Sequence, residues 1–389
     1  MGLLLLAAGI NTLVDPYGFY RLVYAHGFNA IKPRAEQQVS RDKAYGIVFS
    51  KPHAVILGNS RAEIGIDPSS PVWGSAQVVY NAAIPGSGVP TIVEYLEHAI
   101  AQGHVTRAVV GLEFLDFLAD PPSTAAPSVD TGRSTSMDWK SKGNDAIAAI
   151  FSLDALSDSL VTVFQQRNPY APDITANGFN PMRDYEGIAA AEGYGTLFLQ
   201  KNRENAKNYL RAQKRLEAHG RSLGPSWRAL ERLRAICSTG SVQCYFLIYP
   251  YHADTLELFD AAGLWPLFED WKRQLVLRLG PQEETKNAAG DLWDFSGYSR
   301  FTTEPVPARS DRKTPMRWYW EAGHFKAALG EEMLHQMFDS GYDSFGERLS
   351  AANIDQHLMT LRDQRNRYRE EYPEKSGEIR RLVSSLDPK

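Results

Sequence analysis

Short apolar runs that alternate with longer amphipathic stretches constrain the fold of this chain most. The clearest run is QCYFLIY at residues 243–249. Similar runs lie at residues 53–57, 77–80, 107–114 and 291–295. The stretches between them carry apolar residues at helical spacing, as in residues 89–101. Strands that alternate with helices and are apolar on both faces are typical of a parallel sheet. The sequence therefore predicts an α/β fold with a doubly wound, mostly parallel sheet.

The alternation is interrupted in the middle of the chain. Residues 120–137 are rich in Pro, Ser and Thr and predict a long loop, whereas 145–166 and 197–218 predict helices. We therefore expect a largely helical insertion at about residues 121–223, placed as a lid over the edge of the sheet. It interrupts an α/β domain that spans residues 15–345.

Two further helical segments are expected near the carboxyl end of the chain. Residues 322–338 predict a helix that begins directly after Glu321. Residues 346–389 carry dense charges of both signs, which predicts an exposed helical tail with a frayed end. An earlier stretch, residues 256–279, predicts one long helix.

The first fourteen residues are strongly apolar. GLLLLAAGINTLV at residues 2–14 has no charge before Asp15, but a spanning helix needs roughly 20 apolar residues. A basic stretch and a cleavage site, which a complete signal peptide requires, are also missing. We interpret residues 1–14 as a clipped membrane anchor or signal segment, with a short buried helix as the alternative. The anchor interpretation implies a periplasmic or other extracytoplasmic domain attached to the inner membrane.

Composition limits the chemistry that the chain offers. The net charge of −4 gives no reason to expect nucleic acid as a partner. Residues 201–234 hold ten Lys or Arg against three Asp or Glu, which indicates either a solvated helix face or a site for an anionic polymer. Cys237 and Cys244 form either one disulfide or two buried thiols. No cluster has the spacing of metal ligands, so neither a metal nor a cofactor is predicted.

Ser60 is the strongest candidate for a catalytic residue. The run AVIL ends in Gly58-Asn59-Ser60, so the serine either caps a following helix or acts as a nucleophile. A serine nucleophile needs a base, and catalytic groups of doubly wound sheets gather at the carboxyl ends of strands. Of the nine histidines, His252 and His324 follow strands at that edge. Glu321 precedes His324 by three residues, and Asp294 is a rival acid.

These residues resemble the motifs of the SGNH hydrolases, also called GDSL-type esterases. The likeness covers about residues 14–342, apart from the insertion. It is carried by ILGNSR, YNAAIPGSG, GLEFLDF and EAGHFKAALG, and it is closest to SGNH-like proteins of bacterial surface-polysaccharide loci, such as alginate O-acetyltransferases. The resemblance implies an SGNH/flavodoxin-like sheet with Ser60 as nucleophile, His324 as base and Glu321 as its orienting acid. It places oxyanion donors at the Ser60 N–H and at Gly86 or Gly88.

The sequence departs from that family at three positions. Asn59 and Glu321 each replace an aspartate, and Glu113 stands near the place of an asparagine that donates to the oxyanion. Losing one such donor costs roughly 3–4 kcal/mol of transition-state stabilisation. Asn59 and Asn81 are the candidates to replace it.

The resemblance implies acyl transfer, most simply O-acetyl transfer, or ester hydrolysis on a surface polysaccharide. The partners would be an acyl donor, a polysaccharide acceptor and a membrane-bound acyltransferase or export protein. Asn59, Arg61 and His252 are the expected substrate-binding residues. The alternative is a non-catalytic component of a polysaccharide export or modification complex that binds glycan or a membrane partner. The missing asparagine and the basic insertion favour this alternative, and the intact order of serine and Glu-x-x-His favours the enzyme.

Overall fold

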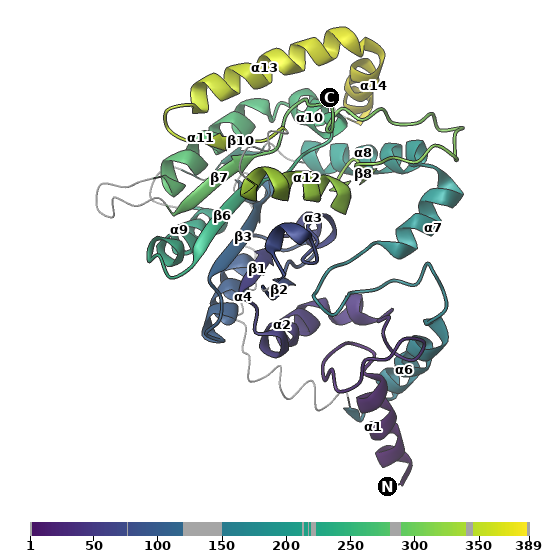
Figure 1. Ribbon diagram of the computed structural model, residues 1–389. Coiled ribbons are helices and arrows are strands. Elements are labelled where there is room, and N and C mark those ends of the chain that lie inside the picture. The colour runs from purple at the N-terminus through teal and green to yellow at the C-terminus, as the bar shows by residue number, and fades with distance from the viewer. Residues whose placement is uncertain are drawn as a thin grey trace, which may run out of the picture.

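The computed structural model describes residues 2–75, 77–119, 150–211, 214–216, 218, 223–280, 289–339 and 345–386 (Figure 1). Its centre is a six-stranded sheet in which all neighbouring strands are parallel except β10 and β7. The strands, in sheet order, are β10 (Glu347–Leu349), β7 (Gly290–Asp294), β6 (Gln243–Ile248), β3 (Arg107–Leu112), β1 (Ala54–Leu57) and β2 (Val79–Asn81). The expected α/β class with a mostly parallel sheet is thus confirmed.

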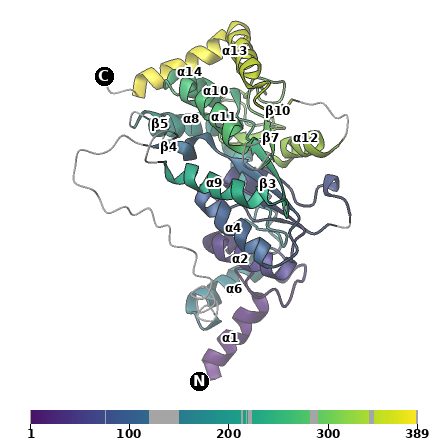
Figure 2. The same cartoon turned by 90° about the vertical axis from the view of Figure 1, so that its left-hand side faces the viewer.

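The expected apolar runs form the strands because both faces of the sheet are covered. All four residues of β1 are buried, and so are five of the six in both β3 and β6. Helices α4, α9 and α11 cover one face, while α3 and α12 lie against the other (Figures 1 and 2). A strand without a solvated face has no reason to alternate apolar and polar residues, which explains the continuous runs.

The helices account for most of the remaining chain. They are α1 (Gly2–Val14), α2 (Val39–Ser50), α3 (Ser60–Gly65), α4 (Val89–Ala101), α6 (Leu153–Gln165), α7 (Arg183–Glu192), α8 (Tyr194–Leu210), α9 (Pro225–Ser238), α10 (Ala253–Ala261), α11 (Trp265–Leu279), α12 (Ala327–Phe338), α13 (Ile354–Glu371) and α14 (Pro373–Leu386). Short 3-10 helices are η1 (Ala35–Gln38), η2 (Pro71–Trp73) and η3 (Phe114–Phe117). Two-stranded sheets pair β4 (Leu118–Ala119) with β5 (Arg215–Leu216), and β8 (Tyr319–Glu321) with β9 (His324–Phe325).

The strand order reverses between β1 and β3. The chain passes from β1 to its neighbour β2 on one side, and returns to place β3 on the other side of β1. Connections leave β1 and β3 in opposite directions at such a point, so a crevice forms beyond their carboxyl ends. Ser60 follows β1 and Glu113 follows β3, which brings both to this crevice.

Two helix predictions were wrong in detail. The expected helix over 256–279 is broken into α10 and α11, with Gly263 at a positive φ of 74° between them. The expected helix over 322–338 begins only at Ala327, because Glu321 and His324 belong to the β8–β9 hairpin. The Glu-x-x-His motif is therefore held by backbone pairing across the hairpin rather than by a helix start.

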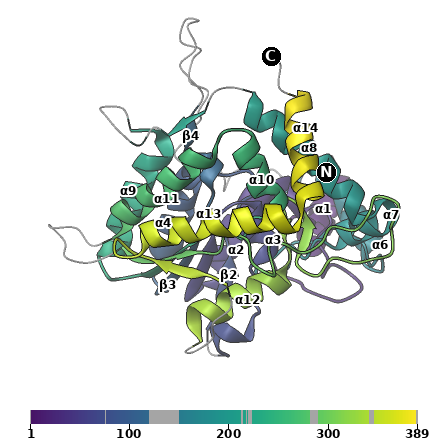
Figure 3. The same ribbon diagram turned by 90° about the horizontal axis from the view of Figure 1, so that it is seen from above.

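The charged carboxyl-terminal segment is helical and largely exposed as expected from Ile354 on, but its first residues form β10 of the central sheet and one face of its helices packs on the domain. Helix α13 lies across the domain and α14 packs beside α8 and α10 (Figure 3). Arg365 pairs with Asp260 at 2.6 Å, and Arg369 pairs with Glu257 at 3.0 Å. Apolar side chains beneath these pairs are buried, namely Leu358, Leu361, Tyr368, Ile379 and Val383. The charge pattern reflects partners on α10, which sequence alone does not reveal.

The expected insertion is distributed over two places. Helix α6 packs against α1 at one end of the molecule, whereas α8 contacts β8, α10 and α14 (Figure 1). The expected loop at 120–137 lies outside the described residues. None of the helices in the described part of the chain combines the length and apolar character that crossing a membrane requires.

Cys237 and Cys244 form a disulfide, the first of the two alternatives that the sequence left open. Cys237, near the end of α9, is bonded to Cys244 in β6. The bridge ties the helix to the strand that follows it.

Candidate active site

The turn after β1 explains why a buried strand ends in Gly58. Its φ is 153°, and a Cβ there would lie 2.4 Å from Tyr249 Oη and 2.8 Å from Ala62 Cβ. The turn leads directly into α3, whose cap is Asn59: its Oδ1 accepts the Arg61 N–H at 3.0 Å. The capping alternative for Ser60 was therefore wrong, and its hydroxyl is left for another partner.

The partner of that hydroxyl is His324. Ser60 Oγ lies 2.8 Å from His324 Nε2, although the residues are 264 positions apart. On the other side of the ring, His324 Nδ1 contacts Glu321 Oε1. With Nδ1–H donating to the carboxylate, Nε2 is the acceptor for the serine hydroxyl. The structure thus brings together the serine, histidine and acid that the sequence singled out.

Glu321 is buried but held in its ionised form. Burial opposes its charge, but His324, nearby Lys201 and the Gly323 N–H together lower the pKa of this carboxyl. The Gly323 N–H donates to Oε2 at 2.6 Å. A Cβ on Gly323 would lie 2.9 Å from Lys201 Cε, so glycine lets α8 approach the pair. Lys201 is a site residue that the sequence showed only as part of a basic stretch.

The glycine-rich turn after β2 lies beside the serine turn. The Ile84 N–H donates to the Gly58 carbonyl at 3.0 Å, and Ser87 Oγ donates to the same oxygen at 3.3 Å. Gly86 is exposed with a φ of 68°. Within the described residues, neither the Ser60 N–H nor the Gly86 N–H has a hydrogen-bond acceptor. Both are thus free to donate to a ligand.

Asn81 does not take the place of the missing side-chain donor. It is fully buried, and its Nδ2 donates to the carbonyls of Ala62 and Ile66, each at 2.9 Å. Its Oδ1 accepts the Ala83 N–H. The expectation for Asn81 is therefore corrected: its amide holds β2 to the end of α3, because a buried amide must satisfy all of its polar atoms.

Glu113 is paired rather than free. Its carboxylate forms an ion pair with Arg61, and its Oε1 accepts the Tyr251 hydroxyl at 2.8 Å. The Arg61 guanidinium also lies 5.2 Å from the centre of the Tyr251 ring. Arg61, expected to bind substrate, is thus mostly buried and neutralises the acid that follows β3.

Asp116 is a neighbouring carboxyl that the sequence analysis did not single out. It would lie 3.6 Å from a Cβ on Gly88, which places it against the glycine-rich turn. Burial raises its pKa to about 7, partly opposed by the Arg61 charge. Its position shortly after β3, in GLEFLDF, is the signal that would have found it.

Two other candidates lie away from Ser60. His252 is 2% exposed, and its ring nitrogens contact the Asp254 N–H at 3.1 Å and the Glu304 carbonyl at 3.0 Å. It caps α10 and has no surface to offer a substrate, so that expectation is corrected. Asp294 forms a buried ion pair with Lys272 at 2.7 Å, so it does not orient His324.

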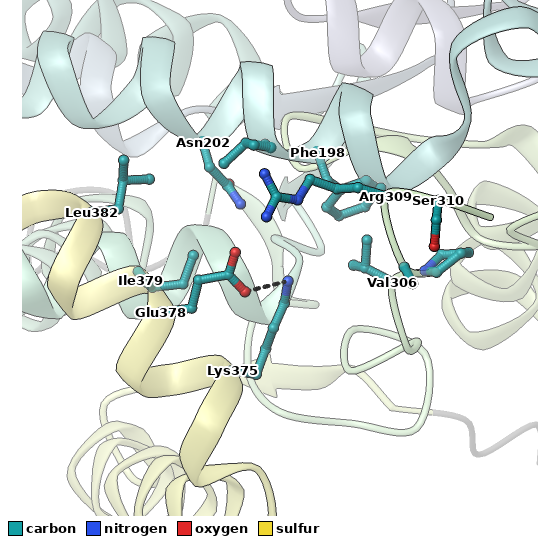
Figure 4. A pocket seen from close by; sticks show the side chains of 13 residues that line it. Phe198, Asn202, Val306, Arg309, Ser310, Lys375, Glu378, Ile379 and Leu382 are labelled. Carbon is teal, nitrogen blue, oxygen red and sulfur yellow. Dashed lines mark ion pairs between the residues drawn. The ribbon is translucent and has the colours of Figure 1, made fainter. Parts of the chain in front are cut away.

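A cavity of about 650 Å³ lies between α8, the loop at residues 306–310 and α14. Figure 4 shows Asn202, Arg309 and Lys375 directed into it, with Lys375 paired to Glu378. None of the lining residues belongs to the serine–histidine–glutamate group. Lys201 reaches Gly323 while Asn202 lines the cavity, so α8 borders both places.

Ser60, His324 and Glu321 are thus in contact, and the position after β3 holds Glu113 rather than an asparagine. The described residues contain no group of three or more His, Cys, Asp or Glu side chains arranged to hold a metal ion. None of the protein-family models, curated proteins or solved structures compared with the chain matches it.

Proposed function

We propose that the protein is a serine-dependent O-acyltransferase or esterase that acts on a bacterial surface polysaccharide. The observation that carries this proposal is the continuous contact from Ser60 Oγ through the His324 ring to the Glu321 carboxylate. Two chain segments that are remote in sequence meet here, so that the base lies beside the nucleophile and the acid lies behind the base. Such an arrangement is the recurring form of an activated serine nucleophile.

In the proposed reaction, Ser60 Oγ attacks the acyl carbonyl and forms a tetrahedral intermediate. His324 Nε2 takes the serine proton and returns it to the leaving oxygen, so that the carbon–oxygen bond breaks and an acyl-serine remains. A sugar hydroxyl or water then attacks, loses its proton to His324, and releases the acyl group from the serine. Glu321 holds the ring tautomer and stabilises the imidazolium.

The Ser60 and Gly86 N–H groups are the proposed oxyanion donors. The Ser60 N–H is the first of α3 and lacks an acceptor in the described structure, so the positive end of the helix adds to its effect. The Gly86 turn is tied to Gly58 by two hydrogen bonds. Fixed donors of this kind cost no reorganisation when charge develops on the substrate oxygen.

The strand order supports the resemblance to SGNH hydrolases. The parallel part of the sheet has the order β2-β1-β3-β6-β7, which is the flavodoxin-like arrangement 2-1-3-4-5. The serine follows the first strand, and the acid and base follow the last parallel strand. We propose membership of that superfamily on this arrangement together with the motifs.

The proposed location is outside the cytoplasmic membrane. The Cys237–Cys244 disulfide is typical of oxidising compartments. Leu4, Leu5 and Leu6 of α1 are at least half exposed, as expected for a segment that enters a membrane. This location would place the site beside surface polysaccharide and beside a membrane-bound acyl donor or export protein.

One observation favours the non-catalytic alternative. The position after β3 holds Glu113, an acid paired with Arg61, where an amide donor is expected. A site with two backbone donors alone gives weaker stabilisation of the oxyanion. In this alternative, the same crevice binds glycan without turning it over.

Covalent labelling decides between the two. A fluorophosphonate probe should modify Ser60, and Ser60→Ala and His324→Ala should abolish labelling. The matched control is Ser241→Ala, which removes an exposed hydroxyl in the turn before β6, at the opposite edge of the sheet from Ser60. In cells, Ser60→Ala should lower the O-acyl content of the polysaccharide. Unlabelled Ser60 together with unchanged acylation in a strain that still contains the folded variant would favour the binding protein.

A further inference from the structure

Helices α1 and α6 pack against each other with their apolar side chains outward. The buried positions of α6 are Ala155, Ser159 and Thr162, each at most 2% exposed. Its exposed positions include Leu153 at 72% and Phe164 at 82%. A surface helix of a domain in water shows the opposite arrangement, with its apolar stripe toward the core.

The exposed apolar residues of α6 form one face. Leu153, Leu160 and Phe164 are separated by seven and four residues, which returns to the same side of a helix with 3.6 residues per turn. Leu160 is 52% exposed. A contiguous face of this kind marks a contact with another apolar phase or partner.

The contact between the two helices is small and polar. Ala7 and Ala8 of α1 are buried, and Asn11 is 1% exposed. Asn11 Nδ2 donates to the Ile150 carbonyl at 2.9 Å, and the Ser159 hydroxyl donates to Asn11 Oδ1 at 3.1 Å. In a lipid environment, helices associate through small residues and buried polar side chains. Burying a leucine between them gives no hydrophobic free energy there, because the lipid tails are equally apolar.

The exposed leucines of α1 argue against a protein as the occupant. Leu4, Leu5 and Leu6 are consecutive and therefore point in three directions about 100° apart. One docked protein would have to enclose the helix, whereas lipid chains surround it without a matching shape. Figures 1 and 2 both show α1 extending from the end of the molecule where α6 lies.

The charges at this end agree with a lipid surface. Helix α1 carries no charged side chain. Helix α6 carries two acids: Asp154 is exposed in its first turn, at the level expected for headgroups, and Asp158 is turned toward Arg34 at 3.2 Å and toward Tyr17, whose hydroxyl donates to it at 2.7 Å. Arg167, just beyond α6, is exposed and suited to anionic headgroups.

We propose that α6 is a second membrane-contacting element, which lies in the bilayer interface with Leu153, Leu160 and Phe164 in the acyl region beside α1. The inference rests on the membrane location proposed above and is independent of the acyl chemistry. It gives the domain two contacts with the membrane, so the site would keep a fixed orientation above the lipid surface. A single helix on a flexible joint does not provide this.

Vesicle flotation of the full chain tests the proposal, with vesicles of phosphatidylethanolamine and phosphatidylglycerol. Replacing Leu153, Leu160 and Phe164 together by Gln should weaken partition at least about tenfold, because each side chain loses its apolar burial. The matched control replaces Leu277 and Met359, exposed apolar residues of α11 and α13, by Gln and should change partition less than about twofold. Circular dichroism verifies that the variants fold.

A further variant distinguishes membrane binding by α6 from membrane binding by α1. Replacing Leu4, Leu5 and Leu6 by Gln tests α1 alone. If that variant fails to bind and the α6 variant binds like the parent chain, α1 is the whole contact and the inference is overturned. If the parent chain does not bind protein-free vesicles, both the location and the inference fail.

A site-specific probe gives a second readout. Leu160→Cys, labelled with a polarity-sensitive fluorophore, should shift its emission to shorter wavelength on vesicles, since both native cysteines are bonded to each other. Met359→Cys with the same label should not shift. Equal emission from Leu160→Cys with and without vesicles would overturn the inference.

Discussion

Two of the acid–histidine pairs at the carboxyl edge of the sheet, Glu321–His324 and Asp294–His357, differ in what surrounds them. Glu321 and His324 meet Ser60, and the His324 side chain is 20% exposed. Asp294 contacts His357 Nε2 at 2.8 Å, but its third partner is the Lys272 ammonium, and both Asp294 and Lys272 are completely buried. The second pair has charge balance, and the hydroxyl beside it, Ser296 Oγ, accepts from Lys272 at 2.7 Å instead of contacting the histidine. An acid beside a histidine therefore indicates chemistry only where a hydroxyl and solvent complete the arrangement.

The electrostatics of the two acids follow from these partners. Burial alone would raise the pKa of Asp294, but the Lys272 ammonium and the His357 ring hold it well below its usual range. Glu321 has a lowered pKa although it is buried, chiefly through His324. Asp294 is stabilised by the neighbouring Lys272 ammonium, and Glu321 by a ring whose charge changes during the proposed reaction.

The largest expected effect separates the two histidines. Ser60→Ala and His324→Ala should each lower kcat/KM on a model acetyl ester by about 10⁴–10⁶-fold, because nucleophile and base act as a unit. His357→Ala, the matched control, should leave kcat/KM within about twofold at temperatures where the variant is folded. Ester hydrolysis followed by absorbance checks this. A comparable loss of kcat/KM in His357→Ala would contradict the assignment of His324 as the catalytic base.

Glu321→Gln should lower kcat by about 10⁴-fold, at the mild end of the range for Ser60→Ala and His324→Ala. The amide retains the shape of the acid but no longer stabilises the imidazolium or selects one tautomer. Steady-state kinetics checks the result, and Glu304→Gln serves as a control at an acid outside the relay. A variant as active as the parent would remove Glu321 from the mechanism.

Lys272→Met should have the next largest effect, on stability. It leaves Asp294 buried without its ammonium, which costs about 3–5 kcal/mol in the free energy of unfolding. Urea unfolding at neutral pH measures this, with ester activity recorded in parallel. An unchanged free energy of unfolding would show that the Lys272–Asp294 ion pair does not stabilise the fold.

Asp116→Asn should change the pH dependence of stability. The folded pKa of about 7 lies above the ordinary value of 3.8, so the native state binds the additional proton. Folding stability is then lost as pH rises from about 4 through 7. The variant should be more stable than the parent by about 4 kcal/mol at pH 8 and about equally stable at pH 4. Urea unfolding at both values tests this; parallel pH profiles for the two proteins would contradict it.

Glu113→Gln should have the smallest effect. The Arg61 side chain is 13% exposed and loses its counter-charge, while the amide oxygen still accepts the Tyr251 hydroxyl. We expect a loss of about 1–2 kcal/mol in the free energy of unfolding. Thermal or urea unfolding measures it. A stability gain would mean that the ion pair does not compensate its desolvation.

The sequence by itself determined the sheet and the chemical type of its site. Continuous apolar runs such as QCYFLIY are required by a strand with both faces covered, so β1, β3 and β6 were predictable. Ser60 was predictable because it follows β1 directly, and His324 because the chain that carries it leaves the last parallel strand at the same edge. Strand direction and local composition carry that information.

Only the tertiary structure decided which polar side chains form buried hydrogen bonds and ion pairs within the protein and which remain available to a substrate. Asn81, His252 and Asp294 had suitable chemistry and position in the sequence, but their hydrogen bonds go to carbonyls, backbone N–H groups and a lysine from distant segments. The same holds for Glu113, whose partner Arg61 lies 52 positions away. Buried polar atoms must form hydrogen bonds with the groups that pack against them. Those groups come from remote segments of the chain, so a local sequence pattern does not identify them.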